Sequence, residues 1–145
     1  MRRVLTVVAA AAAMLAGGVA ATTATASAAD SVGWCDGTRT IKVSSTATVR
    51  QPYHTGTGSR DCTLAEGAVG GAVSTLQRAL KLCNFATNLD IDGEFGSLTE
   101  QAVSYAQSKR GTGVDGIYGP DSRQAFHWPT YSLNGSLTGR CVTTS

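Results

Sequence analysis

The stretch that decides the fold is residues 92–103, Asp-Gly-Glu-Phe-Gly-Ser-Leu-Thr-Glu-Gln-Ala-Val, because its pattern returns at residues 115–126 as Asp-Gly-Ile-Tyr-Gly-Pro-Asp-Ser-Arg-Gln-Ala-Phe. Both copies read Asp-Gly-x-aromatic-Gly, two free positions, Thr or Ser, one free position, and then Gln-Ala-apolar. Asp bonds to nearby backbone and Gly accepts a positive φ, so Asp-Gly favours a tight turn. Each copy therefore predicts a tight loop that leads into a helix.

Each copy also carries signals for the start of its helix. Ser97 and Glu100 have the spacing of a capping box in the first copy. Pro120 suits the first helical position in the second, where its missing N–H is not needed. An aromatic residue, Phe95 or Tyr118, lies between the two glycines. Two interpretations of these rings are open: both fill the core beneath their loops, or at least one stays partly exposed and lines a ligand groove.

Apolar residues at helical spacing predict helices at 71–82, 97–109 and 120–127. The expected buried residues are Val73, Leu76, Leu80 and Cys83 in the first helix, Leu98, Ala102, Val103 and Ala106 in the second, and Ala125 and Phe126 in the third. Basic residues suit the last turn of the second helix, and Gly111 suits its end. Helices of this length with short loops predict a mainly α fold, a compact three-helix bundle.

The flanking segments predict short β-strands. Alternating polar and apolar residues at 40–44 and 47–50 indicate two strands, the second ended by Pro52. Their threonine hydroxyls either present hydrogen-bonding groups to sugars or form solvated strand edges. In the tail, Asn134-Gly135 predicts the turn of a hairpin, which can pair with the N-terminal strands.

Residues 70–80, Gly-Gly-Ala-Val-Ser-Thr-Leu-Gln-Arg-Ala-Leu, together with the two copies, resemble the small helical-repeat family of peptidoglycan-binding domains. That family opens with Gly-x-x-Val-x-x-Leu-Gln-x-x-Leu and continues with Asp-Gly-x-Phe-Gly-x-x-Thr-x-x-Ala-Val and Asp-Gly-Ile-x-Gly. The resemblance extends over residues 64–128. Two departures stand near the expected groove: Ala106 replaces the usual Phe before Gln, and Thr112 replaces the usual Leu after Gly. They bear on the identity of the ligand more than on the fold.

The resemblance implies a non-catalytic module that binds bacterial cell-wall peptidoglycan, in a groove between the repeat loops and the second helix. The expected ligand-binding residues are Phe95, Tyr105, Gln107, Arg110 and Tyr118. The rings would stack on sugars or pack on peptide methyl groups, while Gln107 and Arg110 would hydrogen-bond the stem peptide. Gln107 and Tyr118 occupy motif positions of the family, whereas Tyr105 and Arg110 follow from spacing and chemistry alone.

The N-terminal segment is typical of an export signal. A basic start, an apolar run from Val4 to Ala16 and a small-residue site at Ala26-Ser27-Ala28 predict a signal peptide over residues 1–29. A retained anchor is the alternative. The remaining divisions are a β-rich arm at 30–63, the helical domain at 64–128 and a hairpin tail at 129–145. The expected location is therefore extracellular or associated with the cell wall.

Charge narrows the classes of partner. The chain has 12 basic and 10 acidic residues, and removal of the signal takes away Arg2 and Arg3 without removing any acidic residue. Ten charges of each sign then remain, and no basic run points to nucleic acid or to an anionic membrane. We expect a monomer with no nucleic-acid partner and no membrane contact after export.

The four cysteines predict two disulfides, because their number is even and the predicted compartment is oxidising. Three pairings are possible. A return of residues 62–70 along the first helix would favour Cys62 with Cys83 and leave Cys35 with Cys141. Zinc ligation is the alternative, although no Cys-x-x-Cys pair is present.

The sequence contains no catalytic motif that we can assign. It lacks Gly-x-Ser-x-Gly and His-Glu-x-x-His, and its two histidines, His54 and His127, are far apart in the chain. The front half of a calcium loop at 88–93 fails at its twelfth position, which is Thr99. We therefore expect no metal, no cofactor and no enzyme activity.

Two alternatives of other classes stay open. A small disulfide-linked inhibitor of an extracellular enzyme would use residues 53–60 as its reactive loop. A minimal cell-wall hydrolase would use clustered carboxylates such as Glu94 and Glu100, since glycosidases act through a carboxylate pair.

Overall fold

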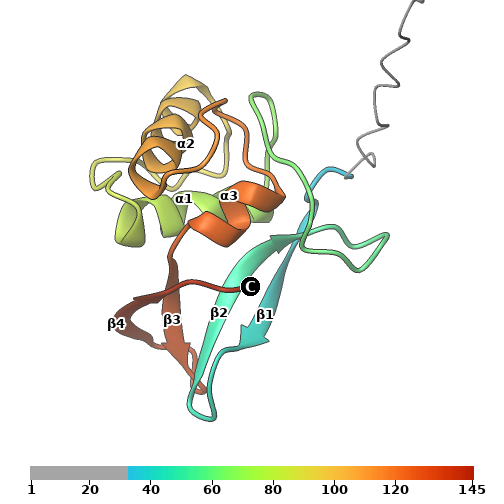
Figure 1. The fold of residues 1–145 in the computed structure, drawn as a ribbon. Coiled ribbons are helices and arrows are strands. Elements are labelled where there is room, and N and C mark those ends of the chain that lie inside the picture. The colour runs from blue at the N-terminus through green and yellow to red at the C-terminus, as the bar shows by residue number, and fades with distance from the viewer. Residues whose placement is uncertain (1–32) are drawn as a thin grey trace, which may run out of the picture.

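The computed structural model describes residues 33–145, which form one sheet and three helices. The elements follow in the order β1 (Gly37–Lys42), β2 (Ala47–Tyr53), α1 (Gly71–Cys83), α2 (Ser97–Arg110), α3 (Pro120–Ala125), β3 (Trp128–Ser132) and β4 (Leu137–Val142). The sheet is antiparallel throughout, in the order β1-β2-β3-β4. Figure 1 shows the helices gathered at one end of the strands, with α2 farthest from the sheet.

The expectation of a mainly α three-helix bundle is wrong, because a four-stranded sheet makes up a comparable part of the fold. The second strand does not end at Pro52 but continues to Tyr53, and Pro52 lies opposite Thr38. Residues 128–132 form a central strand that pairs with β2. The sequence understates this strand because Trp128-Pro129 resembles the end of a helix.

The core joins both parts of the fold around α1. Leu76 and Leu80 of α1 are fully buried, as are Val49 of β2 and Trp128 of β3. Helix α1 contacts the three strands β1, β2 and β3 on one side and α2 on another. The sheet is thus part of the same core as the helices, which explains why the predicted bundle alone does not describe the chain.

The predicted helices are present with nearly the expected bounds, but one predicted cap is wrong. Gly96 is the N-cap of α2, and no side chain caps this end, so Ser97 and Glu100 do not form a capping box. Pro120 does occupy the first turn of α3, and Gly111 ends α2 in the left-handed conformation at φ 72°. Leu98 was expected in the core and is instead 71% exposed.

The favoured disulfide pairing is also wrong: the bonds join Cys35 to Cys62 and Cys83 to Cys141. The reason is that residues 62–64 do not run back along α1. Thr63 exchanges backbone hydrogen bonds with the segment 33–35, which brings Cys62 beside Cys35. All four sulfurs are therefore used in disulfides, and none is available as the thiolate ligand of a zinc site.

Two further expectations concern the export signal and contact with a membrane. The predicted signal peptide and its cleavage site lie outside the described residues. Between residues 33 and 145, none of the helices has the length and apolar character needed to cross a lipid bilayer.

Candidate functional site

A buried glutamine holds each of the two repeated loops. The side-chain amide of Gln77 donates to Asp92 Oδ1 at 2.7 Å, to the carbonyl of Glu94 at 3.0 Å and to Thr99 Oγ1 at 3.0 Å. Its carbonyl oxygen accepts from the N–H of Gly93 at 2.9 Å. One side chain from α1 therefore fixes the whole first loop.

Gln107 makes the same contacts with the second loop. Its amide donates to Asp115 Oδ1 at 2.7 Å, to the carbonyl of Ile117 at 2.9 Å and to Ser122 Oγ at 3.0 Å. Its oxygen accepts from the N–H groups of Asp115 and Gly116. Gln107 was expected to contact the ligand, but the structure places it inside the fold with 2% of its surface exposed.

The aspartates and glycines of the loops have structural roles. Asp92 accepts from the backbone N–H of Glu94 and from Gln77, and these hydrogen bonds lower the pKa of its carboxyl below the ordinary value. At Gly116, with φ 72°, an added Cβ would lie 2.8 Å from Cγ of Glu100. The Asp-Gly pair is therefore required by the loop and leaves little freedom for another role.

Both repeat aromatics are in the core. Phe95 is 2% exposed and Tyr118 is 0% exposed, and Tyr118 packs edge-on against Trp128 at a centroid distance of 6.1 Å. Burial raises the pKa of the Tyr118 hydroxyl. Of the two interpretations, the structure favours rings that fill the core, because neither ring has a face on the surface.

The exposed apolar surface lies instead between α2 and the loop that precedes it. We call this feature the α2 groove; it has a volume of about 260 Å³ and is lined by Phe85, Ala86, Thr87, Asn88, Leu89, Leu98 and Ala102. A second hollow of about 200 Å³ shares Leu89 and Leu98 with it and extends toward the first repeated loop. The two form one continuous surface along the start of α2.

Phe85 is the most unusual residue of the α2 groove. It is 51% exposed, and its φ of 72° places it in the left-handed region, where a residue with a bulky side chain is rarely found. Backbone strain of this kind concentrates at functional sites. Tyr105, which is 50% exposed, meets the Phe85 ring edge-on at 6.4 Å, so the two aromatics extend the groove along α2.

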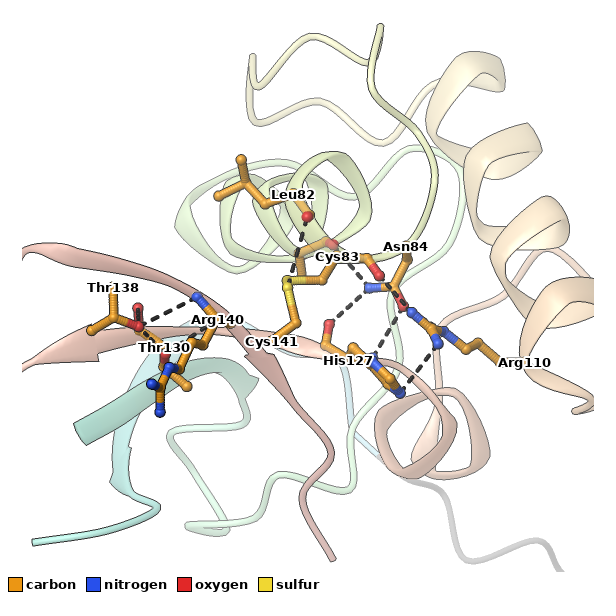
Figure 2. The surroundings of a disulfide bond; sticks show 10 residues. Leu82, Cys83, Asn84, Arg110, His127, Thr130, Thr138, Arg140 and Cys141 are labelled. Atoms are coloured by element: carbon orange, nitrogen blue, oxygen red, sulfur yellow. Dashed lines mark hydrogen bonds between the residues drawn. A yellow bond between two sulfur atoms is a disulfide. The ribbon is translucent and has the colours of Figure 1, made fainter. Parts of the chain in front are cut away.

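Arg110 contacts the Phe85 ring and the two residues that precede it. It donates to Asn84 Oδ1 at 3.1 Å and to the carbonyl of Cys83, and its guanidinium lies 4.8 Å from the centre of the Phe85 ring. A further contact of 3.1 Å joins Nη1 of Arg110 to Nε2 of His127, as Figure 2 shows. Partial burial lowers the pKa of Arg110, and burial together with this cation lowers the pKa of His127. Arg110 therefore joins the end of α1 to α2 and α3.

Charge is distributed unevenly along the groove. The second hollow carries the carboxylates of Asp90, Asp92 and Glu94. At the other end the ammonium of Lys109 lies 5.2 Å from the centre of the Tyr105 ring. This surface therefore has an acidic end, an apolar and aromatic middle, and a basic end.

The residues predicted from the sequence to bind the ligand include two that lie beside the α2 groove but none that line it. Tyr105 and Arg110 lie beside it, whereas Phe95, Gln107 and Tyr118 lie beneath the surface. Phe85 and Leu98 were missed as surface residues. An aromatic residue in the polar loop after Cys83-Asn84 was the only available signal for Phe85, and helical periodicity wrongly placed Leu98 inside.

Comparison with known proteins now decides the family. A family described as a peptidoglycan-binding domain matches residues 69–126, which contain α1, both glutamine-held loops, α2 and α3. Residues 69–126 of this chain therefore form a domain of the peptidoglycan-binding type. The match ends before β3, so the sheet is built from residues outside the family's domain.

Similar proteins carry the domain as a small part of a longer chain. The chain is 36% identical over 91 residues to the N-acetylmuramoyl-L-alanine amidase CwlL of Bacillus licheniformis, covering 62% of this chain and 24% of the amidase. It is 39% identical over 98 residues to the zinc D-Ala-D-Ala carboxypeptidase of Streptomyces albus G, covering 67% of this chain and 31% of that enzyme. A crystal structure of the SleB N-terminal domain shares 36% identity at a TM-score of 0.42, over 44% of this chain and 86% of that domain.

Proposed function

We propose that this protein is a secreted, non-catalytic module that binds bacterial cell-wall peptidoglycan in the α2 groove. The observation that carries the proposal is the exposed apolar surface of Leu98, Phe85 and Tyr105, held beside the loops of a peptidoglycan-binding domain. Large apolar side chains grouped at one surface of a small soluble domain mark binding sites.

The chemistry of the α2 groove fits the parts of peptidoglycan. The faces of Phe85 and Tyr105 suit the apolar faces of sugar rings and the methyl groups of alanine residues. Lys109 can pair with a carboxylate of the stem peptide, and the carboxylates around Asp90 can pair with its amino groups. The ligand would thus lie with its amino-bearing part toward the start of α2 and a carboxylate toward its end.

Location outside the cell follows from the same proposal. The two disulfides are of the kind that persists in oxidising compartments. The amidase and carboxypeptidase relatives are named for cell-wall bonds, which supports an extracellular or wall-associated location. Their activities are not transferred to this chain, which spans about a quarter to a third of their length.

The inhibitor alternative receives no support from the proposed reactive loop. Arg60 is the basic side chain in residues 53–60, and it bonds to Gln51 Oε1 at 3.0 Å and to the carbonyl of Ser145 at 3.2 Å. Arg39 bonds to the carbonyl of Gly58 from outside the loop. Arg60 is thus half-buried and held by other parts of the fold rather than presented at the tip of the loop.

A sedimentation assay tests the proposal with a matched pair of variants. The oxidised protein is mixed with insoluble peptidoglycan, with chitin and cellulose as controls, and the supernatant is checked for released fragments. Leu98→Ser removes the most exposed large apolar residue of the α2 groove, while Leu133→Ser changes a leucine of similar exposure (63%) on the β3–β4 turn. Loss of the leucine contact predicts binding about tenfold weaker for Leu98→Ser alone.

The outcomes separate the alternatives. Binding of the wild type to peptidoglycan but not to chitin or cellulose, with no released fragments and a selective loss in Leu98→Ser, supports the proposal. Released fragments would overturn the non-catalytic role. Failure of the wild type to sediment, or an equal loss in both variants, would overturn the α2 groove as the site.

A further inference from the structure

A third hollow lies on the sheet, in the part of the chain that the family's domain does not include. It has a volume of about 670 Å³, against about 260 Å³ for the α2 groove. Its walls are the β1–β2 turn on one side and β3, β4 and the C-terminal tail on the other. We call it the sheet hollow, and its polar lining residues are Ser44, Thr46, Thr130, Thr138, Thr143 and Arg140.

Some hydroxyls of the sheet hollow bond within the fold, and two do not. Thr130 and Thr138 bond to each other, and Thr130 also donates to the carbonyl of Arg140, so these two organise the strands. Figure 2 shows their side chains together with that of Arg140. The hydroxyls of Thr46 and Thr143 have no hydrogen-bond partner among residues 33–145 and remain available to a ligand.

The charge of the sheet hollow selects for an anion. Arg140 is its charged residue, and no carboxylate is found among the residues that line it. The guanidinium makes no ion pair within residues 33–145, and Arg140 is exposed to solvent. A free guanidinium beside hydroxyl groups suits a carboxylate or phosphate carried by a polyhydroxylated chain.

The hollow lacks the features of a stacking site. Its apolar lining consists of Val43, Ala47 and Val142, and it contains no aromatic ring. Recognition there would rest on hydrogen bonds and charge rather than on ring faces. This separates it chemically from the α2 groove, where aromatic side chains dominate the middle.

From this arrangement we propose that the sheet hollow is a second ligand site, which binds a hydroxyl-rich chain carrying anionic groups through Arg140, Thr46 and Thr143. Two wall polymers share this chemistry: peptide-free glycan strands with lactyl carboxylates, and polyol phosphates. In Figure 1 the β1–β2 turn, which borders the hollow, lies at the end of the sheet opposite α2. One molecule can therefore contact two polymer segments at once, which strengthens attachment without a tighter single site.

The test uses soluble probes that carry no stem peptide, and the position of the shifted signals separates the sheet hollow from the α2 groove. Peptide-free glycan strands and poly(glycerol phosphate) are titrated separately into the oxidised protein, with calorimetry for affinity and amide NMR shifts for location. Arg140→Gln is compared with Arg78→Gln, which removes the same charge from an exposed position on α1. Loss of a charged hydrogen bond predicts affinity about tenfold weaker for Arg140→Gln and no change for Arg78→Gln.

The expected result is that at least one probe moves the amide signals of Thr46, Arg140 and Thr143 and leaves those of Phe85 and Leu98 in place. The probe that binds identifies the source of the anion, and equal binding of both would assign recognition to the shared chemistry. Unmoved signals with both probes, or equal affinity of Arg140→Gln and wild type, would overturn the second site. The difference between Leu98→Ser and Leu133→Ser in the sedimentation test still reports on the α2 groove, because neither leucine lines the sheet hollow.

Discussion

Arg110 was expected to bind the ligand through its charge, but its contacts lie within the fold. Its donors are used by Asn84, by the carbonyl of Cys83 and by the contact with His127, and its flat face lies against Phe85. Asn84 is fully buried and also donates to the carbonyls of Ala79 and His127. We therefore expect Arg110 to act as a positioning residue that holds Phe85 in its strained conformation.

Replacement of this arginine should affect both stability and binding. Arg110→Met keeps much of the side-chain volume but leaves Asn84 without a charged partner, and we expect a loss of about 2 kcal/mol in the free energy of unfolding. Binding to peptidoglycan should weaken as Phe85 loses its support. Urea unfolding followed by tryptophan fluorescence measures the first effect, and sedimentation measures the second.

The neighbouring cation provides the control. Lys109→Met removes the same charge but no hydrogen bond between residues 33 and 145, so its unfolding free energy should change by less than about 0.5 kcal/mol. It should still weaken binding if Lys109 contacts a ligand carboxylate. Equal stability of Arg110→Met and Lys109→Met would contradict the positioning role.

At the scale of elements, the two buried glutamines hold the repeated loops in place rather than contact the ligand. Gln77 and Gln107 each reach from a helix to an Asp-Gly turn, to a backbone carbonyl and to a hydroxyl at the start of the next helix. These hydrogen bonds explain why α2 begins at Ser97 and α3 at Pro120 although no side chain caps either helix. The first loop in turn borders the acidic end of the groove.

Because Gln77 and Gln107 make similar hydrogen bonds, replacing either should lower the free energy of unfolding by a similar amount. Gln77→Ala and Gln107→Ala each leave buried donors and acceptors unpaired, and we expect each to lower the unfolding free energy by about 3 kcal/mol. Gln101→Ala, on the exposed side of α2, serves as the control and should change it by less than about 0.5 kcal/mol. Urea unfolding measures all three. If Gln107→Ala changed the unfolding free energy only slightly but weakened ligand binding, Gln107 would contact the ligand, as the sequence predicts.

The sequence predicts the helices well because their signals are local. The Asp-Gly loops, Pro120 and Gly111 all act within a few residues, and the helices they bound are present. The sheet depends on pairing between β2 and β3, which are separated by most of the chain, and no local pattern reports that pairing. The same reason explains the wrong disulfides, since the position of Cys62 follows from the bridge between Trp34 and Thr63.

The candidate site was predicted less well than the fold because exposure is a property of the packed molecule. Phe95 and Tyr118 look like ligand-binding aromatics in the sequence, yet they are the residues that fill the core beneath the loops. Leu98 matches the helical period of a buried residue but lies on the outside of α2. Phe85 becomes notable only once its backbone conformation is known.

At the scale of the whole molecule, the Cys83–Cys141 disulfide joins the two parts of the fold. It links the last residue of α1 to β4 across 58 positions of sequence, next to Asn84 (Figure 2). Residues outside the family's domain are thereby tied to the loop that carries the α2 groove. The sheet and the groove are expected to depend on each other.

Removal of this disulfide tests that dependence. The double variant Cys83→Ser, Cys141→Ser should lose about 4 kcal/mol of unfolding free energy in the loop-entropy model. It should also bind peptidoglycan more weakly, because the start of the Phe85 loop is no longer anchored to β4. The matched double variant Cys35→Ser, Cys62→Ser should lose a similar free energy but keep its affinity wherever it is folded. Equal affinity of the two double variants would contradict the coupling.

The most direct test of the account is amide NMR mapping of a soluble, stem-peptide-bearing peptidoglycan fragment on the oxidised protein. If the α2 groove is the binding site, the largest shifts occur at Phe85–Leu89 and along the exposed side of α2 from Leu98 to Tyr105. Signals from the buried Phe95, Gln107 and Tyr118 should move less. Absence of shifts along the α2 groove, at a concentration where the fragment binds, would contradict the central claim.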